Sequence, residues 1–254
     1  MELPKNAFKA AIKAGKPQIG LWCSIPSNYT AELLAGAGFD WLLIDTEHTP
    51  VDIETVVTQL QAVAPYPTTP IVRVPVNDKT TIKRYLDTGA QTLLIPMVDT
   101  LEDAKAAVAY TRFPEAGFRG VAGATRATRF GRVKNYHVNA HKEICTLVQV
   151  ESREALQHIE AMAELDGIDG IFIGPADLHA SLGYLGERAH KDIVPVIDDA
   201  IRRIAKAGKA PGILTDSEEN ARRWLECGAT FVAVGADTGL LARGAEALAA
   251  KFKR

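Results

Sequence analysis

Short apolar runs alternate with segments of helical periodicity along almost the whole chain. Eight runs have the length and composition of buried strands, at residues 19–24, 41–45, 70–74, 92–96, 144–150, 170–174, 211–214 and 231–235. Segments with apolar residues every three or four positions, typical of amphipathic helices, lie at 29–37, 52–64, 78–88, 100–112, 152–164, 192–208, 216–227 and 239–252. Glycines such as Gly89 and Gly228 fall where a helix must end and the chain must turn back into a strand.

Eight strand–helix repeats predict an α/β protein, a single-domain (β/α)8 TIM barrel that spans residues 1–254. A short amino-terminal helix around residues 5–14 is expected to plug the bottom of this barrel. Residues 113–143, between the fourth helix and the fifth strand, form a loop too long for an ordinary connection. Because it is basic and rich in glycine, it fits two interpretations equally: a solvated loop or subunit contact, or a lid over an anionic ligand.

Composition removes several classes of protein. A net charge of −2 gives no electrostatic footprint for nucleic acid or anionic lipid. The three cysteines are scattered and lack a C-x-x-C pairing, so neither a disulfide framework nor a zinc site is indicated. No apolar stretch approaches the roughly 20 residues that span a bilayer, and no signal-peptide pattern opens the chain. We therefore expect a cytoplasmic protein with no membrane partner.

Two acidic residues each stand just past a predicted strand. Glu151 follows the run 144–150, and Asp177 follows the run 170–174. Gln149 lies two residues before Glu151, so both side chains face the barrel axis. Either acid alone is best explained as a helix cap, but the two together beside Gln149 favour a hard divalent cation, because no Cys or His pair accompanies them.

A histidine and an arginine occupy the same predicted rim. His48 lies just past the strand 41–45, beside the acids Asp45 and Glu47. This setting makes a catalytic role more plausible for it than for a lone surface histidine. Arg73 lies within an aliphatic strand, where burial is unfavourable unless the guanidinium meets an anion. We expect that anion to be a ligand carboxylate or a developing enolate. Since no lysine stands at a strand end facing the mouth, a Schiff-base mechanism lacks its nucleophile.

Asp87 is placed unfavourably for its own helix. It falls in the last turn of the segment 78–88, where the helix dipole disfavours an acid. A locally unfavourable residue tends to have its reason elsewhere in the structure.

These residues lie in motifs that resemble a known family. The motifs are Gly-Leu-Trp at 20–22, Leu-Ile-Asp-Thr-Glu-His at 43–48, Val-Arg-Val-Pro at 72–75, Leu-Asp-Thr-Gly-Ala at 86–90, Phe-Arg-Gly-Val at 118–121, Gln-Val-Glu at 149–151 and Ile-Gly-Pro-Ala-Asp-Leu at 173–178. Taken in order they resemble the 4-hydroxy-2-oxoheptanedioate aldolases and their relatives, class II metal-dependent pyruvate and hydroxypyruvate aldolases. The loop departs from that pattern at 121–124 and at Phe130, where tryptophan is common, which bears on the aldehyde preference.

The resemblance implies a function and a set of roles. The activity would be reversible aldol cleavage of 4-hydroxy-2-oxo acids to pyruvate or hydroxypyruvate and an aldehyde, through a metal-stabilised enolate. The metal, Mg²⁺, Mn²⁺ or Co²⁺, would be bound by Glu151 and Asp177. Pyruvate would be held by Gln149 and by the backbone at Ala176 and Asp177.

The resemblance also implies catalytic roles and an assembly. His48 would act as the base, Arg73 would stabilise the enolate, and Asp87 from a neighbouring subunit would raise the basicity of His48. A homo-oligomer, a hexamer by resemblance, would follow. The aldehyde side would be lined by Trp22, Phe172, Val121 and Leu214.

Two other functions stay open on sequence alone. An acyl-CoA lyase on a related barrel would use a similar metal but would need a nucleotide site, for which the arginines of 113–143 are the candidates. A metal-binding scaffold without catalysis is the third reading, and it leaves Arg73 and His48 unexplained.

Overall fold

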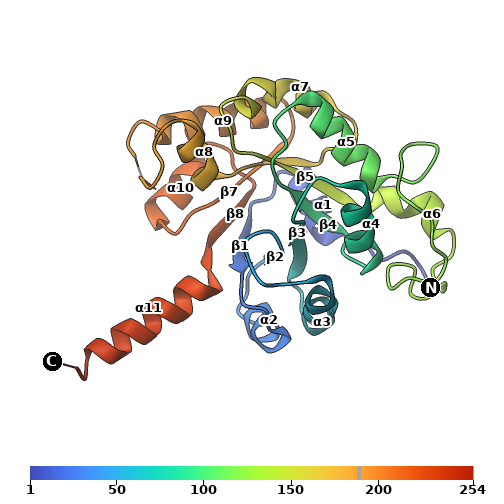
Figure 1. The fold of residues 1–254 in the computed structure, drawn as a ribbon, viewed down its shortest axis with the longest axis horizontal. Helices are drawn as coiled ribbons and strands as arrows, with labels where there is room; N and C mark the ends of the chain where they lie inside the picture. Colours follow the sequence, from blue (N-terminus) through green and yellow to red (C-terminus); the bar gives the residue numbers. More distant parts are fainter. Residues whose placement is uncertain (188–189, 254) are drawn as a thin grey trace.

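Eight parallel strands close into a barrel in sequence order in the computed structural model, which describes residues 1–187 and 190–253 (Figure 1). The strands are β1 (Gln18–Cys23), β2 (Trp41–Asp45), β3 (Thr69–Arg73), β4 (Thr92–Ile95), β5 (Cys145–Val150), β6 (Gly170–Ile173), β7 (Ala210–Leu214) and β8 (Phe231–Ala236). Each predicted strand agrees with the observed one to within one residue at either end. The predicted fold, a single-domain (β/α)8 barrel, is confirmed.

Helices surround the barrel and follow the predicted segments closely. They are α1 (Ala7–Lys13), α2 (Asn28–Ala35), α3 (Ile53–Val63), α4 (Lys79–Asp87), α5 (Leu101–Thr111), α6 (Tyr136–Asn139), α7 (Ile159–Glu164), α8 (Pro175–Ser181), α9 (Val194–Lys206), α10 (Glu218–Glu226) and α11 (Asp237–Ala250). The pattern did not predict two short helices, α6 with four residues and α8 with seven. Among the helices of the described residues, none has both the length and the apolar character that crossing a bilayer requires.

The interior of the barrel is a separate apolar cluster from the layer under the helices. On β5, Cys145 and Leu147 belong to the interior, whereas Val148 and Val150 pack among the helices. This alternation places Gln149 on the interior face, as its spacing predicted. At the amino-terminal end of the barrel, the ring of Phe8 from α1 lies 6.1 Å from that of Trp41 and 5.6 Å from that of Phe231, so the predicted plug is confirmed.

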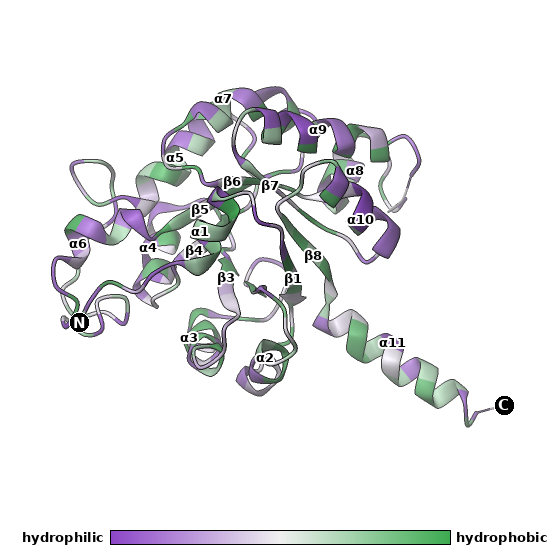
Figure 2. Ribbon diagram, turned by 180° about the vertical axis from the view of Figure 1, so that it is seen from behind, coloured by the Kyte–Doolittle hydropathy of each residue, from purple (hydrophilic) through white to green (hydrophobic). Residues whose placement is uncertain are grey.

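The last helix stands apart from the barrel. Figures 1 and 2 show α11 projecting away from the strands and from the other helices. It is anchored at its start, where the Asp237 carboxylate accepts hydrogen bonds from the N–H groups of Ser24 and Ile25. Beyond that point Leu240, Leu241 and Leu248 are 59–66% exposed, so this helix buries little apolar surface within its own chain.

The long loop is fixed to the carboxyl end of α4. Arg119 is buried, donates to Asp87 over 2.9 Å and lies 4.5 Å from the ring of Phe113. Arg126 donates to the carbonyl oxygen of Thr88 over 2.7 Å. Since α4 ends where the chain returns to the start of β4, these contacts hold the loop toward the amino-terminal end of the barrel. Of the two interpretations of this loop, its position therefore does not fit a lid over the opposite end of its own barrel.

Candidate active site

A cleft of about 330 Å³ lies at the carboxyl ends of the strands. In parallel barrels this end carries the catalytic groups. The cleft brings together most of the side chains singled out from the sequence. It is lined by Trp22, His48, Arg73, Gln149, Phe172, Gly174, Pro175, Ala176, Asp177 and Leu214.

Arg73 is held by acids of its own chain. Its position on β3 pairs in register with Asp45 on β2. The guanidinium donates to both oxygens of Asp45, Nε to Oδ1 over 2.9 Å and Nη2 to Oδ2 over 2.7 Å. It also lies 5.0 Å from the Trp22 ring. Burial opposes ionisation of Asp45, but the hydrogen bonds and the charge of Arg73 outweigh it, so the pKa of Asp45 lies below its usual value.

This contact corrects one argument from the sequence. The sequence favours a ligand anion as the partner of the buried Arg73, whereas Asp45 satisfies the guanidinium within the chain. Sequence reasoning missed Asp45 in this role. The signal was available, because Asp45 and Arg73 both end their strands and neighbouring parallel strands meet at that edge. Arg73 still lines the cleft, so its position agrees with a role toward a ligand.

Glu47 and His48 lie directly after β2. Arg73 Nη1 is 3.0 Å from Glu47 Oε2, and His48 Nε2 is 3.8 Å from the same oxygen. The His48 side chain is 63% exposed, in contrast to 14% for Glu47. Burial raises the pKa of the Glu47 carboxyl above its usual value, although the Arg73 charge acts against the rise.

Glu151 and Gln149 form a buried polar pair at the end of β5. Gln149 Nε2 donates to Glu151 Oε2, and the other carboxylate oxygen accepts the Met97 N–H over 2.8 Å. Gln149 Oε1 is buried and has no hydrogen-bond partner. Burial raises the pKa of Glu151, and the nearby charge of Asp177 acts in the same direction. Two carboxylates near one unpartnered amide oxygen make a set of oxygen donors with unbalanced negative charge.

The turn after β6 shapes this pair. A Cβ at Gly174 would lie 2.8 Å from Glu151 Cβ and 2.9 Å from Gln149 Nε2, so glycine permits their close approach. Pro175 then opens α8, and Asp177 lies in its first turn with an exposed side chain. Asp177 therefore lies at a helix start, as the helix-cap alternative expects. That alternative does not describe Glu151, whose carboxylate bonds to the Met97 N–H rather than to a helix start.

This donor set fits a divalent cation of the Mg²⁺ type. Such ions take oxygen ligands and commonly keep water or substrate in several positions. Within residues 1–187 and 190–253, no group of three His, Cys, Asp or Glu side chains is placed to hold a metal. Glu151 and Asp177 would thus hold only part of a coordination shell, which leaves positions for a ligand.

The rest of the cleft is apolar. The rings of Trp22 and Phe172 lie 5.6 Å apart, and Leu214 lies on the same cleft. No lysine lines it among the described residues, in agreement with the absence of a Schiff-base nucleophile.

Two of the predicted site residues are not brought to this cleft. Asp87 is the last residue of α4 and forms an ion pair with Arg119. This ion pair within the chain explains part of why an acid stands at a helix end that the helix dipole disfavours. Val121 is in the long loop and is 65% exposed. Both could reach an active site only from a neighbouring subunit.

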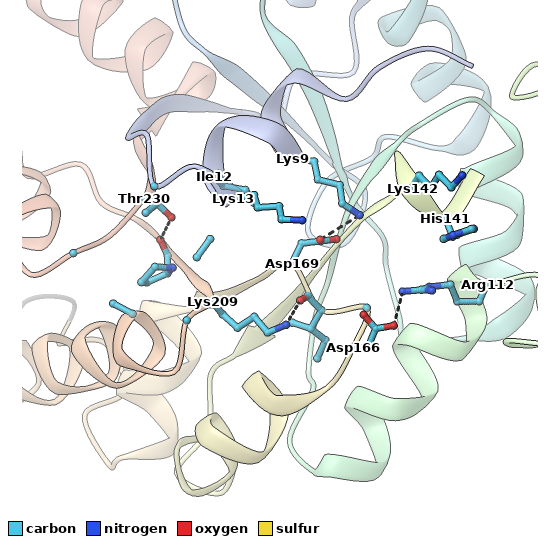
Figure 3. Close-up of a pocket in the computed structure, with 18 residues that line it drawn as sticks. Lys9, Ile12, Lys13, Arg112, His141, Lys142, Asp166, Asp169, Lys209 and Thr230 are labelled. Carbon is cyan, nitrogen blue, oxygen red and sulfur yellow. Dashed lines mark hydrogen bonds and ion pairs between the residues drawn. The ribbon is translucent and has the colours of Figure 1, made fainter. Parts of the chain in front are cut away.

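A larger hollow lies at the other end of the barrel (Figure 3). Its volume is about 850 Å³ and several lysines line it. Lys209 donates to the carbonyls of Leu165 and Ile168, and Lys9 pairs with Asp169. These cations satisfy carbonyl oxygens and an acid where helices end, which is a structural role. We therefore assign the active site to the smaller cleft.

Comparisons with known proteins identify the family of the chain. Residues 18–244 match the family model of the HpcH/HpaI aldolase/citrate lyases. A 4-hydroxy-2-oxo-heptane-1,7-dioate aldolase from Salmonella heidelberg is 59% identical over 249 residues, which cover 98% of this chain and 95% of that protein. A pyruvate aldolase from Rhizobium etli is 58% identical over 252 residues, 99% of each chain.

A solved structure of a family member has the same fold as this chain. The crystal structure of a family protein from Burkholderia cenocepacia has a TM-score of 0.93 to this chain at 40% identity, and covers 97% of this chain and 99% of that one. The family predicted from the motifs is thereby confirmed: the chain belongs to the HpcH/HpaI aldolase/citrate lyase family.

Proposed function

We propose that this protein is a class II aldolase, a divalent-metal-dependent lyase that reversibly cleaves 4-hydroxy-2-oxo acids to pyruvate or hydroxypyruvate and an aldehyde. The observation that carries the proposal is the single cleft in which Arg73, His48 and Gln149 meet Asp177 beside the buried Glu151. Aldolase activity is also what the names of the two relatives from Salmonella heidelberg and Rhizobium etli state for those proteins.

The polar side of the cleft binds the 2-oxo acid. Glu151 and Asp177 would hold the cation, Mg²⁺, Mn²⁺ or Co²⁺. When bound, that cation supplies Lewis-acid stabilisation of negative charge on the 2-oxo acid. Gln149 and the backbone N–H groups of Ala176 and Asp177 hold the carboxylate end of the substrate.

Cleavage of the C3–C4 bond requires two further things from the chain. The proton of the 4-hydroxyl must leave, and His48, with its exposed imidazole at the cleft, accepts it. Negative charge grows on the pyruvate half, and Arg73 stabilises it from a guanidinium already fixed by Asp45. In the synthetic direction His48 takes a proton from pyruvate, and the resulting carbanion attacks the aldehyde.

The apolar side of the cleft receives the aldehyde. Trp22, Phe172 and Leu214 give it an apolar wall. Val121 completes that wall from a neighbouring subunit.

A homo-oligomer, a hexamer by family resemblance, follows from the same proposal. Exposed apolar side chains support it in two places: Phe118, Val121 and Phe130 on the long loop are 64–66% exposed, and the leucines of α11 are similarly open. A second copy of this chain is the occupant we propose for both surfaces. Asp87 would then reach the His48 of that copy.

Metal dependence is the direct test of the proposed function. Chelator should abolish cleavage of a 4-hydroxy-2-oxo acid, and Mn²⁺, Co²⁺ or Mg²⁺ should restore it, because the described lining of the cleft includes Asp177 and no lysine, and Glu151 lies beside it against Gln149. Release of pyruvate is the measurement. If borohydride trapped a covalent adduct with pyruvate, a Schiff base would replace this mechanism.

Subunit mixing tests the role of Asp87. Asp87→Asn and His48→Ala are each expected to lose most of the activity, whereas mixed assemblies should regain part of it. The reason is that some interfaces pair an intact His48 with an intact Asp87. Activity after denaturation and joint refolding, compared with each variant treated alone, is the measurement. No recovery in mixed oligomers verified by mass would remove Asp87 from the site.

The two alternatives receive less support. A CoA site would need the arginines of the long loop, but Arg119 is buried against Asp87 and Arg126 bonds to Thr88. A metal-binding scaffold without catalysis would not need a cleft that combines Arg73 and His48 with an apolar wall.

A further inference from the structure

Glu47 has no role in the function proposed above, yet it lies between the two side chains on which that function depends. The residue follows β2 by two positions, and its backbone N–H donates to Asp45 Oδ1 over 3.0 Å. Asp45 is in turn fixed by both hydrogen bonds from Arg73. The backbone of Glu47 is therefore tied to the Asp45–Arg73 pair.

One oxygen of that carboxylate faces both partners. Glu47 Oε2 lies 3.0 Å from Arg73 Nη1 and 3.8 Å from His48 Nε2, and it is buried without any hydrogen bond. The arginine contact is close enough for an ion pair but is not aligned as a hydrogen bond. His48 has no other ion-pair partner among the described residues, so Glu47 is the acid that its own chain supplies.

We propose that Glu47 is a positioning residue of this active site, which holds the His48 ring over the cleft beside Arg73. This rests on the proposed function, because the positioning matters only if His48 moves a proton there. Each chain then has an acid partner for His48 before a neighbouring subunit adds Asp87. An imidazole that is more than half exposed gains orientation from such a contact.

The charges around Glu47 give the proposal a pH signature. Arg73 and a protonated His48 favour its ionised form, whereas Asp45, Glu151 and burial oppose it, and burial dominates, so the pKa of Glu47 is raised. Above that pKa the wild type carries the positioning charge. As the pH falls through the pKa of Glu47, the carboxylate of the wild type becomes neutral. The activity of the wild type should then approach that of a variant with glutamine at this position.

Glu47→Gln is the test, measured as kcat and KM of pyruvate release by the metal-loaded enzyme. At neutral pH kcat should fall about 10-fold, and KM should change less than about 2-fold, because the contact acts on a proton transfer rather than on substrate binding. The wild-type to variant ratio of kcat should shrink toward one as the pH falls. Glu47→Asp should keep part of the activity, and Glu54→Gln, an exposed acid on α3, should change nothing.

A second readout does not depend on activity. The His48 ring signals in the NMR spectrum, identified by their loss in His48→Ala, should shift in Glu47→Gln while those of the other histidines stay in place. Unchanged His48 signals, or a kcat ratio that is the same at every pH, would overturn the proposal. If the protein cleaved no 4-hydroxy-2-oxo acid but His48 still shifted, the contact would stand and the proposed function would fail.

Discussion

Glu151→Gln should lower aldol cleavage by about 10³-fold or more, the size expected when metal-ion stabilisation worth several kcal/mol is lost. The substitution keeps the shape of the side chain and removes a buried charge beside Gln149 and Asp177. The metal-free protein should not be destabilised, because a like-charge pair is relieved. The measurements are kcat and metal affinity by titration calorimetry.

Thermal unfolding gives an independent check of the same prediction. Metal at 100 times its dissociation constant should stabilise the wild type by about 2.7 kcal/mol, which raises Tm by about 5–10 °C for a chain of this size. That increase should vanish in Glu151→Gln and in Asp177→Ala. Glu143→Gln is the matched control, because this acid pairs with Lys5 away from the cleft. A full metal-dependent rise in the Glu151 variant would contradict the assignment of Glu151 as a ligand.

Arg73→Lys should lower kcat by about 10²-fold or more, by analogy with the removal of a transition-state donor. Arg73 binds Asp45 through two nitrogens and presents a third toward Glu47, an arrangement that a lysine ammonium cannot reproduce. KM should change much less than kcat, because the charge that Arg73 meets grows during cleavage. Steady-state kinetics with a 4-hydroxy-2-oxo acid is the measurement.

The control for this variant is an arginine with the same geometry elsewhere. Arg203 also bonds a carboxylate through two nitrogens, to Glu160 over 2.7 Å each, on the helical layer. Arg203→Lys should leave kcat unchanged. If Arg73→Lys kept the wild-type kcat, or if both variants lost activity equally, Arg73 would be a structural residue only.

The order and bounds of the strands were predictable because they depend on local pattern. A buried parallel strand needs a short apolar run, and a covering helix needs an apolar stripe, so eight alternations define the barrel without knowledge of any contact. The same logic found the cleft, since the carboxyl ends of all eight strands meet at one rim. His48, Arg73, Gln149 and Asp177 could therefore be grouped from their strand ends, whereas Trp22 was expected there only from the family resemblance.

The partners of those side chains were not predictable. Closure of the barrel sets β2 and β3 in a register that gives Arg73 the carboxylate of Asp45, and this pairing removed the need for a ligand to explain its burial. Folding of the long loop onto α4 likewise gave Asp87 a partner in Arg119. Both contacts join residues 28 or more positions apart, beyond the reach of any local period.

The sequence by itself determined the barrel, the rim on which its chemistry-bearing residues stand and the family to which the chain belongs. The tertiary structure alone decided that Glu47 lies between Arg73 and His48, that Gly174 lets Glu151 approach Gln149, and that α11 leaves the barrel. The physical reason is that periodicity fixes which face a residue occupies, whereas strand register, chain closure and close packing fix which side chain it meets.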